Sequence, residues 1–98
     1  MTHIKTFESY DSDKKLVVCD ESVYPLVTSK FKDATIYQRN SNSGVISTLK
    51  TLVSNEHTDI TYVIDDVSKT SADKRLNFIE EYMGQDFKKI NVIKSSEL

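Results

Sequence analysis

Four acidic residues stand in two adjacent pairs, each directly after an apolar run: Asp20 with Glu21, and Asp65 with Asp66. Neighbouring carboxylates repel one another, and a buried carboxylate needs a partner. Clustered carboxylates are typical ligands of Mg²⁺ and Mn²⁺, so this pattern is compatible with a metal site that orients phosphate oxygens. The alternative, which we weight more heavily, is that the four are turn and cap residues facing water at the ends of strands.

The elements that must position these residues follow from the hydrophobic pattern. Continuous apolar runs bounded by charge indicate buried strands, whereas apolar residues spaced three and four apart indicate helices. Pro25 suits the first turn of one helix, Asn55 is the predicted end of the next, and a third begins at Thr70 and ends at Gly84. The pattern predicts strands over 14–19, 34–39, 59–64 and 88–94, and helices over 22–31, 40–55 and 70–84, with Ser22 or Asp20 as the cap of the first helix.

This alternation predicts an α/β fold. Strands joined through helices run parallel with right-handed crossovers, which gives a small three-layer Rossmann-like domain. We expect a four-stranded, mainly parallel sheet of order 2-1-3-4 with three helices, because that order places the two most apolar strands centrally. Residues 14–98 then form a single domain. For residues 1–13, in which Ile4, Phe7 and Tyr10 stand three apart, the pattern leaves two alternatives open, an N-terminal arm or short docking segment and a frayed tail.

The expected topology gathers the acidic pairs. The carboxyl ends of parallel strands meet at one edge of a sheet, where such folds bind ligands. If the first and third strands are neighbours, Asp20, Glu21, Asp65 and Asp66 crowd that edge and are the candidate metal ligands. No other cofactor and no catalytic residue is predicted. Cys19 ends a strand with no histidine nearby in the sequence, so we expect a packed thiol.

Two loose resemblances follow from this order of strands and acidic residues. The chain resembles receiver domains of response regulators, with Asp20 and Glu21 as the acidic pair, Asp65 as the phosphoacceptor and Ser95 after the fourth strand. It departs from them because the sequence ends without the fifth strand and its lysine. It also resembles Toprim domains through Glu21 and the aspartates after the third strand, although theirs is an Asp-x-Asp motif and here the two aspartates are adjacent.

Composition limits the classes of function. The chain has 98 residues, 13 basic against 15 acidic, and a net charge of −2, which lacks the basic excess of a nucleic-acid binder. Only two glycines are present, with no GxGxxG and no GxxxxGK(S/T) motif, which excludes the ordinary dinucleotide-binding and P-loop classes. No apolar run approaches the roughly 20 residues that cross a bilayer, and the opening lacks a signal-peptide core. The expectation is a soluble cytoplasmic protein that contacts neither membrane nor nucleic acid.

Two functions remain open. We favour a non-catalytic protein–protein interaction or assembly module, whose partner is another protein or a second copy, and whose edge segment 34–39 can accept a strand. Residues 4–10, IKTFESY, resemble the openings of many tailed-bacteriophage virion proteins, which implies a viral structural or accessory protein. The alternative is a Mg²⁺-dependent phosphoryl-transfer or receiver-like domain that uses the acidic residues at the sheet edge.

Overall fold

The computed structural model describes residues 15–67 and 71–98. The predicted arm, residues 1–13, lies outside the described residues, as does the predicted helix cap Thr70. Within the described ranges the chain forms a four-stranded parallel sheet and three α-helices, in the strand order β2-β1-β3-β4. The α/β fold and the strand order are therefore confirmed.

The strands are β1 (Leu16–Asp20), β2 (Thr35–Arg39), β3 (Ile60–Ile64) and β4 (Ile90–Lys94). All residues of β1 and β3 are buried, as expected for central strands covered by helices on both faces. β2 and β4 are the edge strands and are mostly half-buried. Every pair of neighbouring strands is parallel, so the sheet is entirely rather than mainly parallel.

The α-helices are α2 (Tyr24–Lys30), α3 (Asn42–Ser54) and α4 (Ala72–Met83). Ser41 caps α3, because its hydroxyl accepts a hydrogen bond from the Gly44 N–H at 3.1 Å. α4 ends at Met83, and the next residue, Gly84, has a φ of 60°, a conformation that glycine adopts readily. Short 3-10 helices over Glu21–Val23, Gly84–Lys89 and Ser95–Glu97 extend the connections beyond the predicted boundaries.

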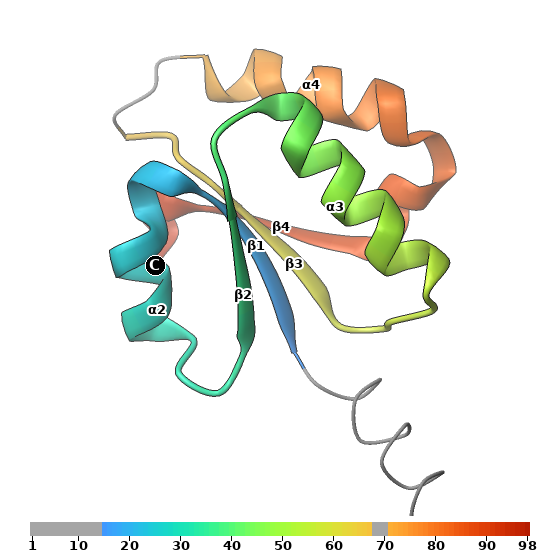
Figure 1. The fold of residues 1–98 in the computed structure, drawn as a ribbon. Coiled ribbons are helices and arrows are strands. Elements are labelled where there is room, and N and C mark those ends of the chain that lie inside the picture. The colour runs from blue at the N-terminus through green and yellow to red at the C-terminus, as the bar shows by residue number, and fades with distance from the viewer. Residues whose placement is uncertain (1–14, 68–70) are drawn as a thin grey trace, which may run out of the picture.

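The helices form two layers around the sheet. α2 lies on one face, and α3 and α4 lie side by side on the other (Figure 1). This arrangement follows from right-handed crossovers, because the chain moves outward from β1 to β2 and then back across to β3. Alternate strand residues point to opposite faces and build two cores. The α3–α4 core contains Val18, Leu49, Tyr62 and Ile79, and the α2 core contains Val17, Cys19, Val27 and Val63.

The register brings the strand ends to a common edge. Asp20 is paired with Arg39 of β2, and Ile64 of β3 is paired with Lys94 of β4. Asp65 and Asp66 follow β3 directly, so they leave the sheet beside the end of β1. Among the described residues, no helix has both the length and the apolar character needed to cross a membrane.

Candidate functional site at the carboxyl edge of the sheet

Two of the four predicted ligands are buried at the centre of the carboxyl edge. Asp20 is the last residue of β1 and is 2% exposed, and Asp65 follows β3 and is 0% exposed. α2 and α4 leave this edge toward opposite faces of the sheet, so the carboxylates lie where the strand order reverses. In parallel α/β sheets this position is the usual ligand site.

Both oxygens of the Asp20 carboxylate are bound within the chain. Oδ1 accepts from the Tyr62 hydroxyl at 2.7 Å and from the Arg75 guanidinium at 2.8 Å. Oδ2 accepts from the Asp65 backbone N–H at 2.7 Å. A buried carboxylate is stable only when paired and hydrogen-bonded in this way. Asp20 therefore ties β1 to β3 and α4, and these bonds occupy positions that metal binding would need.

Tyr62 and Arg75 complete this buried network. Burial, and then the charge of Asp20, raises the pKa of Tyr62 far above its usual range, so the hydroxyl remains a donor. Arg75 also approaches the Tyr62 hydroxyl at 3.3 Å and the Asn42 side chain at 3.4 Å. The sequence pattern assigned neither side-chain partner to Asp20. It offered two signals, a basic residue in the first turn of the third predicted helix and a tyrosine in a buried strand, because a buried tyrosine hydroxyl usually finds a polar partner.

Asp65 is held from two sides. The Ser22 hydroxyl donates to its Oδ2 at 2.5 Å, and the Val67 backbone N–H donates to its Oδ1 at 3.0 Å. The prediction that Ser22 caps a helix is wrong. The 3-10 helix Glu21–Val23 begins immediately after β1, so Asp20 holds the cap position and the Ser22 hydroxyl points across the sheet edge.

Asp66 turns away from this pair and binds the chain after β4. Its Oδ1 accepts from the Ser95 hydroxyl at 3.0 Å and the Ser96 N–H at 2.9 Å, and its Oδ2 accepts from the Ser96 hydroxyl at 2.6 Å. Hydrogen bonds from Ser96 lower the pKa of Asp66 below its ordinary value, and the bond from the hydroxyl has a larger effect than the bond from the backbone N–H. Hydrogen bonds to the ionised form have this effect. Asp66 therefore anchors the 3-10 helix Ser95–Glu97.

Glu21 lies on the other side of the edge. Its side chain is exposed and lines a small polar hollow of about 200 Å³ with Gln38, Arg39 and Asn40. The four acidic residues thus share one edge without gathering around one point. In the part of the chain that the structure describes, no three acidic, histidine or cysteine side chains are grouped as metal ligands. Metal binding by these four residues stays a prediction.

Cys19 packs in the α2 core and is 0% exposed. Burial, and then the charge of Asp20, raises the pKa of its thiol to about 11. The thiolate is the nucleophilic form, so this cysteine is unreactive at neutral pH. The structure agrees with the expectation of a packed thiol.

A second feature, an apolar groove between α3 and α4, was not expected from the sequence. Phe78 and Tyr82 continue the apolar stripe of α4, yet they remain 41% and 57% exposed. Their rings lie 4.6 Å apart, centroid to centroid, and both residues line a groove of about 560 Å³. The other lining residues come from α3 and are Ser43, Ile46, Ser47, Lys50 and Thr51.

No family model, curated protein or solved structure matches this chain. The function is therefore inferred from two features of the molecule. They are a carboxyl edge at which Asp20, Asp65 and Asp66 are bound within the chain, and an open apolar groove beside an aromatic pair.

Proposed function

We propose that the protein is a non-catalytic assembly module, in which the groove between α3 and α4 binds residues 1–13 of a neighbouring copy. The observation that carries this proposal is the exposed pair of aromatic side chains, Phe78 and Tyr82, beside the groove. Aromatic side chains supply a large part of the binding energy at protein interfaces, and an amphipathic segment in an apolar groove is a common mode of recognition.

The state of the acidic residues supports a role without catalysis. Asp20 is neutralised by Arg75, and Asp66 is bound to Ser95 and Ser96. A metal ion or phosphate would have to displace these contacts, each of which holds two elements of the fold together. Cys19 is buried with a raised pKa, which removes the chain's one thiol as a nucleophile at neutral pH.

The groove and the N-terminal segment have complementary chemistry. Among the residues that line the groove, Lys50 carries the one formal charge, and the apolar contribution comes from Ile46 and the aromatic pair. The segment offers apolar residues at 4, 7 and 10, with acidic residues at 8, 11 and 13. An apolar stripe with acidic flanks suits an apolar groove bordered by a lysine.

The start of the described chain also favours this segment as the occupant. Lys15 forms a salt bridge of 3.3 Å with Asp59, and the Leu16 N–H donates to the Asp59 carbonyl at 2.9 Å. The described chain therefore begins beside the loop that follows α3. Thirteen extended residues span up to about 43 Å, which is enough to reach the α3–α4 face of an adjacent copy.

The resemblance of residues 4–10 to virion-protein openings is consistent with such an assembly. Virion proteins function in arrays of repeated copies, and a module that passes a short segment to its neighbour would serve in one. On this proposal the chain is a structural or accessory protein of a tailed bacteriophage.

Sedimentation velocity over a range of protein concentrations tests the proposal. We expect concentration-dependent association of the full chain that weakens by about tenfold or more in Phe7→Asp and in Tyr82→Ser, since each removes an aromatic anchor. The control is Tyr24→Ser, which removes a tyrosine that is 37% exposed on α2, on the opposite face of the sheet. The double variant Phe7→Asp with Tyr82→Ser should associate no more weakly than either single variant, because the effects of substituting two residues in contact are not additive.

Additive losses in the double variant would contradict a direct contact between the segment and the groove. The proposal would also be overturned if Phe7→Asp melts at a lower temperature than wild type but sediments in the same way as wild type. That result would place the segment on its own domain rather than on a neighbour.

A further inference from the structure

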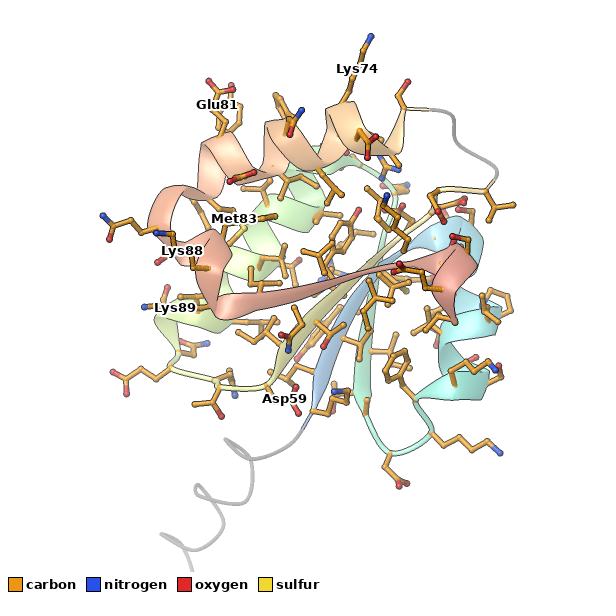
Figure 2. The ribbon with its side chains drawn as sticks, turned by 180° about the vertical axis from the view of Figure 1, so that it is seen from behind. Asp59, Lys74, Glu81, Met83, Lys88 and Lys89 are labelled. Atoms are coloured by element: carbon orange, nitrogen blue, oxygen red, sulfur yellow. The ribbon has the colours of Figure 1, made fainter. Side chains whose placement is uncertain are left out.

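β2 is an edge strand with one side open. It pairs with β1 alone, and within the described residues no strand lies beyond it (Figure 1). The opposite edge strand, β4, is flanked by lysines at both ends, with Lys88 and Lys89 before it (Figure 2) and Lys94 as its last residue. Lysines at a sheet edge discourage pairing with another strand. The β2 edge, whose strand TIYQR contains no lysine and no proline, is the less protected of the two.

The backbone groups that point outward from β2 can be identified. The Thr35 N–H donates inward to the Lys15 carbonyl at 3.1 Å, on the β1 side. Successive residues of a strand point their N–H and C=O groups to alternate sides. The outward-facing groups therefore belong to Ala34, Ile36 and Gln38.

Two of these outward groups already have partners in their own chain. The Ala34 N–H donates to the Phe31 carbonyl at 3.3 Å. The Gln38 carbonyl accepts from the Arg39 guanidinium at 2.7 Å. The groups left for a partner strand are thus the N–H and C=O of Ile36, the C=O of Ala34 and the N–H of Gln38.

We propose that β2 pairs antiparallel with β2 of a second copy about a two-fold axis, with Ile36 opposite the partner's Ile36. In this register the two Ile36 residues exchange both of their hydrogen bonds. Each Gln38 N–H donates to the partner's Ala34 carbonyl. The two groups that would face each other without bonding, the Ala34 N–H and the partner's Gln38 carbonyl, are the two that are satisfied within their own chains.

The side chains fit the same register. Asp33 lies in the turn directly before β2, and antiparallel pairing brings this turn near the partner's Arg39 at each end of the paired strands. Opposite charges that lie close together at an interface favour association. The Arg39 Nε donates to the Thr48 hydroxyl at 2.8 Å, which holds the guanidinium at this end of the edge.

The register also preserves the two faces of the sheet. Residues directly opposite one another in an antiparallel pair point to the same face. Ile36 packs in the α2 core and Tyr37 packs in the α3–α4 core. The two four-stranded sheets would therefore continue as one eight-stranded sheet, with both α2 helices on the same side of it.

Amide hydrogen exchange of the full chain, measured residue by residue at low and high concentration, tests this pairing. We expect the Ile36 and Gln38 amides to exchange at least about tenfold more slowly in the dimer, because only pairing gives them an acceptor. The Tyr37 amide faces β1 and should be protected at both concentrations. This measurement does not depend on the groove, so it separates this inference from the proposed binding of residues 1–13. The measurement is repeated in Phe7→Asp, in which the binding of that segment is weakened but the β2 edge is unchanged.

Two variants and a control complete the test by sedimentation equilibrium. Gln38→Pro removes an outward N–H that makes no bond to β1, and proline is tolerated on edge strands. It should weaken the dimer by about tenfold or more, since two hydrogen bonds are lost. Asp33→Lys should weaken it by roughly tenfold, because each dimer then has two lysines near the two Arg39 side chains in place of two aspartates. Glu56→Lys, the same charge change in the exposed loop after α3, should leave it unchanged.

Exchange of Ile36 and Gln38 that is equally fast at both concentrations would overturn the inference. Dimerisation of Asp33→Lys with the wild-type affinity would also overturn it, and this variant retains the whole β1–β2 ladder. If Gln38→Pro fails to fold, the exchange data and Asp33→Lys still decide the question.

Discussion

The Arg75 guanidinium lies 2.8 Å from Asp20 Oδ1, although 55 positions separate the two residues in the sequence. Their side chains are only 16% and 3% exposed. This ion pair joins the first turn of α4 to the last residue of β1, across a chain segment that includes β2, α3 and β3. The position that would hold a ligand in other parallel α/β sheets is here used to connect the sheet to a helix.

The first prediction concerns the cost of breaking this pair. Arg75→Met should lower the free energy of unfolding by about 3–5 kcal/mol, because it leaves the buried Asp20 carboxylate without a counter-charge. Adding Asp20→Asn to Arg75→Met should recover part of that loss, since the uncompensated charge is removed. Urea denaturation of the two variants measures both values. Lys74→Met, at the neighbouring exposed position of α4 (Figure 2), is the control and should change stability by less than about 0.5 kcal/mol.

The second prediction concerns Asp66 and pH. Because its folded-state pKa is lowered, the ionised carboxylate stabilises the fold at pH values above the ordinary aspartate pKa of about 3.9. That contribution is lost as the pH falls through the lower, folded-state pKa. Asp66→Asn should therefore melt at a lower temperature than wild type at pH 7.

The gap between the two melting temperatures should narrow as the medium is acidified and close at the lowest pH. Thermal melts of both proteins from pH 7 to pH 2 measure this gap. Glu81→Gln, which alters an exposed carboxylate on α4 (Figure 2), serves as the control. A gap that stays constant over this range would show that the Asp66 charge does not stabilise the 3-10 helix after β4.

The third prediction addresses the metal-site hypothesis. We expect millimolar Mg²⁺ or Mn²⁺ to leave the melting temperature unchanged, because Asp20 and Asp66 are already bound to donors within the chain. A specific site filled at 100 times its Kd would instead add about 2.7 kcal/mol. Wild type and Asp65→Asn are compared with and without each ion. A shift in wild type that disappears in the variant would revive the phosphoryl-transfer hypothesis.

The fold could be predicted because its signals are local. The runs LVVC and ITYVI are apolar and bounded by charge, which predicts central strands, and the helices between them require parallel pairing. Ser41, Asn55 and Gly84 mark helix ends through backbone chemistry that acts within a few residues. The boundaries moved by at most two residues, and the first helix begins later than predicted because the 3-10 turn Glu21–Val23 precedes it.

The site was predicted only in outline. The sequence placed all four acidic residues at one edge of the sheet, because that follows from strand order alone. It did not assign their partners, since the Ser22–Asp65 contact joins residues 43 positions apart and the Tyr62–Asp20 contact joins residues 42 apart. It also did not separate Asp66 from Asp65, because adjacent residues leaving a strand turn in directions that their surroundings decide.

The sequence by itself determined the α/β class, the strand order, the central position of β1 and β3 and the edge to which the acidic residues belong. Each of these depends on periodicity and caps, which are properties of neighbouring residues. Only the tertiary structure decided that Arg75 neutralises Asp20, that Phe78 and Tyr82 remain exposed, and which backbone groups of β2 are free to pair. These depend on how distant elements pack, and a buried charge or an open groove exists only once those elements are together.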